Sequence, residues 1–176
     1  IARKSGAVLE ILHVNIAAIY STPLTEYVVV SKFEGDDQQY DDTAVSKLEK
    51  LKMELLADPA YANLNIQIRV EEGYLHSAVR NVAQDDAVDL VVMGTKGTSG
   101  MNEFLVGSNT EKVIRTSPCP VLAVPEGTQT FAPKIALLPS TLKDDQLNVF
   151  KYVAGWEKLF KFHTRVLYLN NVRNLP

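Results

Sequence analysis

The amino-acid sequence predicts an α/β fold built on an open, doubly wound parallel sheet. Short runs rich in β-branched residues alternate with amphipathic helical patterns along the 176 residues. The segments expected to be strands are separated by helices, which favours parallel pairing with right-handed crossovers. With 46% hydrophobic and 22% charged residues, the composition excludes collagen-like, disordered and coiled-coil chains.

The first third of the chain predicts a helix end, a strand, a short extended segment and a long helix. Residues 1–4 have the pattern of a last helical turn, with Gly6 as its left-handed stop. AVLEILHV (7–14) is expected to be a strand, and YVVVSKF (27–33) an edge strand or hairpin arm. The spacing of leucines predicts a helix over 43–57, capped by Asp41 or Asp42 and stopped by Pro59.

The remaining elements follow in alternation. The pattern predicts a strand at 64–70 ended by Gly73, a helix at 75–84, a strand at 88–93 covered on both faces, a helix at 108–116 and a strand at 120–124. After a polar linker (126–133), a strand at 135–138, a helix opened by Asp144 and a strand at 163–169 are expected.

Charge and cysteine content narrow the function classes. The single cysteine, Cys119, cannot form an internal disulfide, and no Cys and His cluster has zinc-ligand spacing, so a cytoplasmic protein is expected. Residues 1–125 hold 11 Lys and Arg against 17 Asp and Glu, whereas residues 126–176 hold 7 against 4. The acidic main body argues against a nucleic-acid partner, and no apolar run approaches the roughly 20 residues of a membrane span.

The loop after the strand at 88–93 contains the candidate ligand-binding residues. Gly94, two residues, Gly97, nine residues and Gly107 precede Ser108 and Asn109, which open the next helix. Ligands of open α/β sheets bind outside the carboxyl ends of strands, where glycines let backbone amides approach phosphate oxygens. The loop is neither a Walker A loop nor a dinucleotide fingerprint. Lys96 is a candidate phosphate contact, and Thr98 and Ser99 are weaker ones.

This glycine spacing resembles the ATP-binding motif of the universal stress protein family. DLVVMG before it, TEKVIRTSPCPVLAVP after it and SGAVLEILHV near the start resemble that family's strands and helix in their usual order. The resemblance implies a Rossmann-like, adenine-nucleotide-binding α/β fold and, as ligand, ATP or another adenine nucleotide, with or without Mg²⁺. It implies nucleotide contacts at Val14, Met93, Gly94, Gly97, Gly107, Ser108 and Asn109.

The resemblance also implies a domain organisation. Residues 1–125 resemble a family domain that lacks its first strand and most of its first helix, 126–133 a linker, and 134–176 the first β-α-β unit of a second copy. The chain is therefore expected to be a fragment of a tandem member. The Asp that normally ends the first strand has no counterpart in the first copy, and Thr141 stands at that place in the second.

Purely structural roles, which need no ligand, compete with the functional interpretations. Ser108 and Glu111 also form a capping-box pattern that needs no ligand, His13 fits a packed or hydrogen-bonded core residue, and Asp85, Asp86 and Asp89 fit a solvated charge run. No nucleophile with a base, paired carboxylates or metal-ligand cluster indicates catalysis. The expected function is nucleotide control of conformation or association, with at most slow ATP hydrolysis. The alternatives are a structural or partner-binding module with a vestigial site and an ATP-cleaving enzyme.

The expected lack of a central strand predicts how the sheet is completed. A sheet without its central strand leaves two strands with unpaired amides and carbonyls. Ile135–Leu138 is the spare strand, so residues 134–160 are expected to complete the sheet, either within one chain or by strand exchange in a homodimer.

Overall fold

The computed structural model describes residues 1–15, 19–21, 27–29, 37–95, 107–128, 130–143 and 146–168. The chain divides into two compact units. The larger unit holds Ala2 and residues from Gly6 to Thr128, and the smaller one holds Ile1, Arg3–Ser5 and the described residues from 130 onward. The division falls within the segment that the sequence predicts to be a linker.

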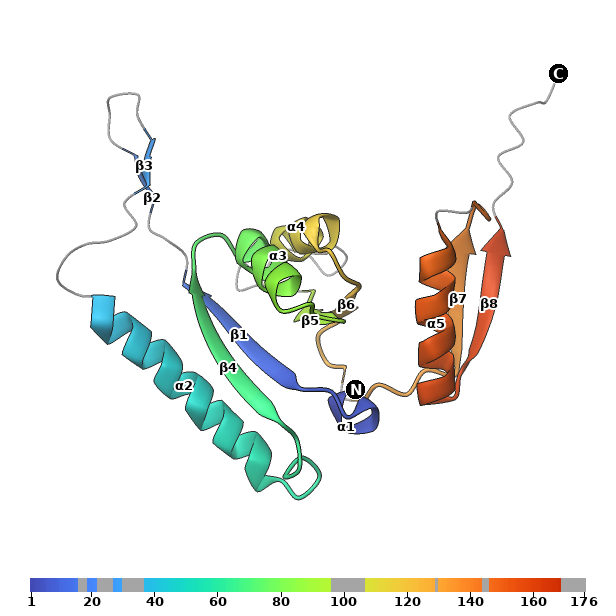
Figure 1. Ribbon diagram of the computed structural model, residues 1–176, viewed down its shortest axis with the longest axis horizontal. Coiled ribbons are helices and arrows are strands. Elements are labelled where there is room, and N and C mark those ends of the chain that lie inside the picture. Colours follow the sequence, from blue (N-terminus) through green and yellow to red (C-terminus); the bar gives the residue numbers. More distant parts are fainter. Residues whose placement is uncertain are drawn as a thin grey trace. The chain divides into compact units, whose positions relative to one another are not determined.

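Helices separate most of the described strands, as the sequence predicts (Figure 1). α1 (Ala2–Ser5) is divided between the units, with Ala2 in the larger one. The larger unit contains β1 (Leu9–Asn15), β2 (Ile19–Ser21), β3 (Tyr27–Val29), α2 (Asp37–Ala57), β4 (Ile66–Glu72), α3 (Leu75–Asp85), β5 (Val91–Gly94), α4 (Ser108–Thr116) and β6 (Val121–Val124). The smaller unit contains β7 (Ile135–Ser140), α5 (Leu147–Phe160) and β8 (His163–Tyr168). Part of α1 clusters with it.

Parallel pairing joins the main strands. β1 pairs with β4, β5 with β6, and β7 with β8, all in parallel, which confirms the α/β fold class. β2 and β3 form an antiparallel pair, so the expected extended segment is one arm of a small hairpin. Among the described residues the strands form four two-stranded sheets. β7 has β8 along one edge, and the expectation that Ile135–Leu138 completes the sheet of residues 1–125 stays a prediction.

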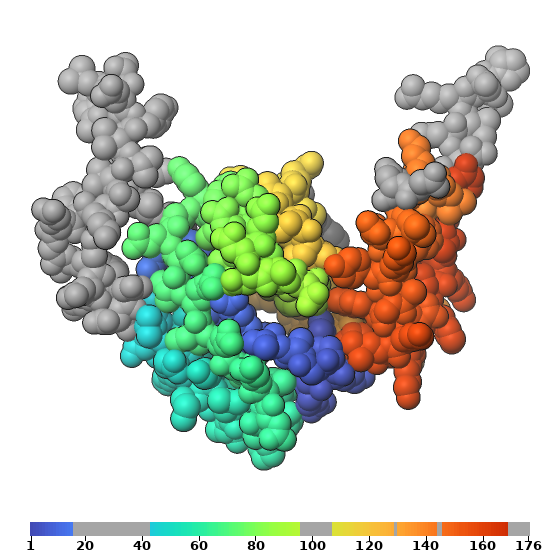
Figure 2. Space-filling view, in the orientation of Figure 1, coloured from blue at the N-terminus to red at the C-terminus, as the bar shows by residue number. Residues whose placement is uncertain are grey.

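Helices bury the apolar faces of the larger unit. Leu48 of α2 and Ile66 of β4 are buried where that helix packs on that strand. α3 and α4 pack against each other, and their green and yellow atoms lie side by side in Figure 2. Val113 of α4 is fully buried there, and α3 contributes a stripe of four buried residues: Ala78, Val79, Val82 and Ala83. The amphipathic spacing of both helices explains this packing.

Three local expectations need correction. α2 begins at Asp37, so Asp41 and Asp42 lie inside the helix and do not cap it. β5 begins at Val91, and Val92 keeps 53% of its surface exposed, so this strand is not covered on both faces. A strand is covered on both faces only where other elements pack on each side of its sheet, and Val92 points to a side that stays open. The predicted cap Asp144 lies outside the described residues.

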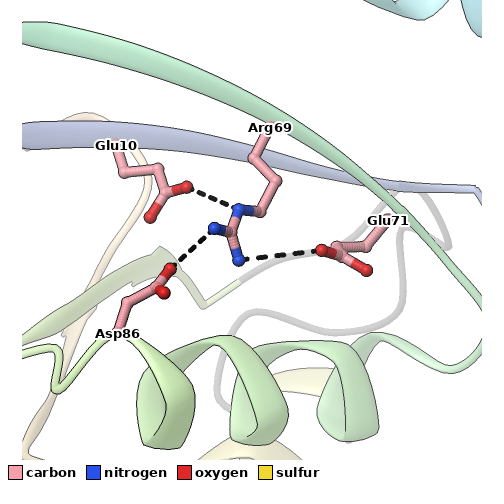
Figure 3. Close-up of polar contacts among 4 residues, drawn as sticks. All are labelled: Glu10, Arg69, Glu71 and Asp86. Carbon is pink, nitrogen blue, oxygen red and sulfur yellow. Dashed lines mark ion pairs between the residues drawn. The ribbon is translucent and has the colours of Figure 1, made fainter.

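A charged cluster fastens the end of α3 to the sheet (Figure 3). Arg69 on β4 donates from Nε to Glu10 Oε1 on β1 at 2.8 Å and from a terminal nitrogen to Asp86 Oδ2 at 2.7 Å. Glu71 lies 3.7 Å from its other terminal nitrogen. Asp86, expected to be part of a solvated charge run, is thus held by an arginine.

The smaller unit has a core of aromatic side chains. The ring of Phe131 meets the rings of Phe160 and Trp156 edge to face, with centroids 4.9 and 5.7 Å apart. This geometry is the favoured one for aromatic pairs, and it packs the residues before β7 onto α5. In the part of the chain that the structure describes, no helix combines the length and the apolarity that crossing a membrane requires.

Candidate functional site

The candidate site lies where β5 ends and α4 begins. Gly94 is the last residue of β5, and Gly107 directly precedes α4. The N–H of Gly107 donates to the carbonyl oxygen of Thr95 at 2.8 Å, while the N–H of Thr95 donates to Val124 of β6 at 3.1 Å. The described ends of the glycine loop are therefore joined directly. Lys96, Gly97, Thr98 and Ser99 lie outside the described residues.

The start of α4 is not capped as the capping-box pattern predicts. Gly107 is the N-cap residue, with φ −56° and ψ 146°, and no side chain of the described residues makes the cap hydrogen bond. Ser108 is the first helical residue, and the Glu111 carboxylate instead accepts from Arg115 Nε and Nη2 at 3.0 and 2.9 Å. The capping-box interpretation is wrong because the helix begins one residue too early for it.

This uncapped start has consequences for ligand chemistry. The first amides of a helix have no partner within the helix, and the helix dipole adds partial positive charge there. Ser108 and Asn109 are exposed, so their surroundings are open to solvent. The start of α4 therefore has the chemistry to bind an anion such as a phosphate group.

A buried hydroxyl supports the same junction. Thr110 is 3% exposed, and its Oγ1 donates to the carbonyl oxygen of Gly94 at 2.8 Å. The first turn of α4 is thus tied to the end of β5 at two points, through Thr110 and through Gly107.

The structure brings some of the predicted site residues together. Gly94 and the run Gly107, Ser108 and Asn109 lie at one junction, and Met93 is half-buried on β5 opposite Ala123. Val14 lies on β1 opposite Glu71, and no sheet pairing joins β1 to β5 among the described residues. Its predicted contact with an adenine ring therefore stays a prediction.

The other candidate residues show no catalytic arrangement. His13 is exposed, which corrects the expectation of a core position, and its Nε2 lies 3.0 Å from Asn15 Oδ1. Cys119 is half-buried beside Ser117, whose hydroxyl donates to the Cys119 carbonyl at 2.8 Å. Thr141 follows β7, and its N–H donates to Gln146 Oε1 at 3.1 Å. Among the described residues, no group of three or more His, Cys, Asp or Glu could hold a metal ion.

A comparison of the chain with protein-family models identifies its family. The model of the universal stress protein family matches residues 1–125. The chain belongs to the universal stress protein family. It is 34% identical over 96 residues to Universal stress protein MJ0577 of Methanocaldococcus jannaschii, a match covering 54% of this chain and 57% of that protein. The chain thus spans little more than half the length of this relative.

Two further comparisons agree. Universal stress protein YxiE of Bacillus subtilis is 30% identical over 129 residues, which cover 70% of this chain and 83% of that protein. The solved structure of universal stress protein UspA from Lactobacillus plantarum matches with a TM-score of 0.51 and 23% identity, covering 70% of this chain and 81% of that one. This last likeness supports the fold alone.

Sequence reasoning missed two features of this family member. Thr110 carried a weak signal, since it precedes the buried Val113 by three residues and therefore shares its helix face. The Arg69 cluster carried a signal in the strand alternation, which puts Arg69 and Glu71 on one face of β4. The contribution of Asp86 depends on tertiary placement and had no local signal.

Proposed function

We propose that this universal stress protein binds ATP or another adenine nucleotide and that the nucleotide controls its conformation or its association with a partner. The observation that carries the proposal is the junction of Gly94 and Gly107, which sets an uncapped helix start beside a glycine-bearing strand end. Family membership and the glycine spacing support the same ligand.

The residues present fit a phosphate group. Gly107 has no side chain to obstruct an approach to α4, and the Ser108 hydroxyl is exposed beside the first-turn amides. Gly97 and Lys96 would add a backbone amide and a charge from the same loop. A bound Mg²⁺ would neutralise phosphate charge, so the ligand is tested with and without it.

Mass spectrometry of nucleotide released from the freshly purified, denatured chain tests the proposal, followed by calorimetric titration with ATP and ADP. We expect an adenine nucleotide in the release and binding in the titration. If neither appears at millimolar concentration, the proposed function is wrong.

Substitution at Gly107 locates the site. Gly107→Val is expected to abolish ATP binding with little loss of fold, because its φ of −56° suits any residue while the branched side chain would obstruct the phosphate approach. Gly155→Val is the matched control, since a Cβ at Gly155 in α5 meets nothing within 4 Å. If Gly107→Val binds ATP with unchanged affinity, the nucleotide binds at another place on the chain.

The alternatives make different predictions. A module with a vestigial site would bind no nucleotide but would keep its fold and its partner. An ATP-cleaving enzyme would turn over at the roughly 1 to 1,000 per second typical of enzymes, whereas we expect at most slow hydrolysis. The exposed, uncapped start of α4 favours a working site over a vestigial one.

We also propose a cytoplasmic homodimer in which β7 of each chain completes the partner's sheet. The acidic first part and basic last part of the chain support association, and Leu137 on β7 is 61% exposed. Light scattering should show a dimer that Leu137→Lys converts to a monomer, because a charge on an edge strand opposes pairing. Leu147→Lys, at a helix position 57% exposed, is the matched control. A wild-type monomer at all concentrations would contradict the dimer.

The domain organisation belongs to the same proposal. Residues 134–176 would be the start of a second family domain in a tandem protein. The β7-α5-β8 order and its parallel pairing support this assignment.

A further inference from the structure

We propose that Thr110 is a positioning residue of the nucleotide site, holding the start of α4 against the end of β5 so that the helix amides face the phosphates. This inference rests on the proposed function. Thr110 would not touch the ligand, because it is 3% exposed and its hydroxyl is already engaged with Gly94 at 2.8 Å.

The hydrogen bond of the Thr110 hydroxyl leaves its own helix. A threonine inside a helix commonly donates back to the carbonyl four residues earlier, as Thr116 does to Lys112 at 2.8 Å. Thr110 instead donates out of its helix, to a residue 16 positions earlier on β5. Its hydroxyl therefore joins two elements and does not merely satisfy its own helix.

The acceptor explains why the contact matters. The N–H group of Thr95, which belongs to the same peptide group as the Gly94 carbonyl, donates to Val124 of β6. Because carbonyl and N–H of one peptide group point in opposite directions, the Gly94 carbonyl points away from β6. Thr110 supplies the hydrogen bond that this carbonyl lacks from the sheet.

Two hydrogen bonds orient the start of α4 against β5 more firmly than one. Packing against α3 holds the body of α4, the Gly107 to Thr95 bond joins its start to the end of β5, and the Thr110 bond adds a second point that sets the angle of its first turn against β5. An anion at a helix start is bound through several amides together, so a small pivot weakens all of these contacts at once.

The experiment compares Thr110→Val, which removes the hydroxyl at nearly constant shape, with Thr110→Ser, which retains it. Thr116→Val is the matched control, since it removes an equally short hydrogen bond from the same helix without a link to β5. We expect Thr110→Val to raise the Kd for ATP about tenfold, the scale of one lost hydrogen bond. Thr110→Ser and Thr116→Val should stay within about threefold of the wild type.

Two readouts separate positioning from a general loss of structure. Adenosine has no phosphate, so its Kd should change little in Thr110→Val while that for ATP rises. Hydrogen exchange at the Gly107 amide should accelerate in Thr110→Val and not in Thr116→Val. If Thr110→Val does not fold, Thr110→Ala replaces it, since alanine favours the helix.

The outcomes separate the two proposals. Wild-type protein that binds no ATP overturns the proposed function and with it the role of Thr110 at the site. Wild-type binding that Thr110→Val leaves unchanged overturns the role of Thr110 alone. The role of Thr110 would also be overturned if Thr110→Val weakened the binding of ATP and adenosine equally. The same holds if Thr116→Val raised the Kd for ATP as much as Thr110→Val does.

Discussion

Removing the arginine of the charged cluster tests whether that cluster fastens α3 to the sheet. Arg69→Met keeps an apolar stem but deletes the guanidinium that binds Glu10 at 2.8 Å and Asp86 at 2.7 Å. The side chains of Arg69, Glu10 and Asp86 are 33%, 23% and 41% exposed, so these pairs are neither fully solvated nor buried.

The expected magnitude follows from this intermediate exposure. Exposed ion pairs contribute about 0.2 to 1 kcal/mol each, and hydrogen bonds to charged groups about 1.5 to 3 kcal/mol. Two short pairs of intermediate exposure therefore predict a loss of about 1 to 3 kcal/mol in the free energy of unfolding. Repulsion among the remaining carboxylates adds to this loss.

Urea unfolding followed by circular dichroism measures the loss, and hydrogen exchange of the β1 and β4 amides locates it. Arg115→Met is the matched control, because Arg115 pairs with Glu111 on one exposed helix face, where such pairs contribute about 0.2 to 0.5 kcal/mol. Salt at 1 M should reduce the Arg69→Met effect, since it shortens the screening length to about 3 Å. A loss no larger than that of Arg115→Met would refute the reasoning.

Two further predictions follow from the described contacts. Ser108→Ala should lower the unfolding free energy by less than about 0.5 kcal/mol, because Ser108 makes no cap bond, whereas a capping serine would lose about 0.5 to 2 kcal/mol; urea unfolding distinguishes the two. Phe131→Ala should destabilise the smaller unit by about 1 to 3 kcal/mol through two lost edge-to-face contacts, and should shift the fluorescence of Trp156, the single tryptophan, to longer wavelength. Unchanged emission would contradict that packing.

The sequence predicts the order and type of most elements because periodicity is a local property. The helix over 108–116 has the predicted bounds, and the stops at Gly6 and Gly73 show positive φ of 70° and 113°. These glycines are predictable since only glycine readily adopts that backbone conformation.

Pairing partners and side-chain contacts were less predictable because they depend on tertiary placement. No periodicity indicates that β7 pairs with β8. The capping-box pattern at Ser108 and Glu111 failed because α4 begins one residue earlier than the pattern requires, with Gly107 as N-cap, and Arg115 binds the glutamate. The partner of Thr110 lies 16 residues away, beyond any local pattern.

Nuclear magnetic resonance of the ¹⁵N-labelled chain during an ATP titration tests the central claim most directly, since it reports both binding and its place. The account predicts shifts in the amide signals of Gly94, Gly107, Ser108 and Asn109 as ATP is added, with the signals of α5 unchanged. Amide signals at the start of α4 that stay fixed at millimolar ATP, or shifts confined to other elements, would contradict it.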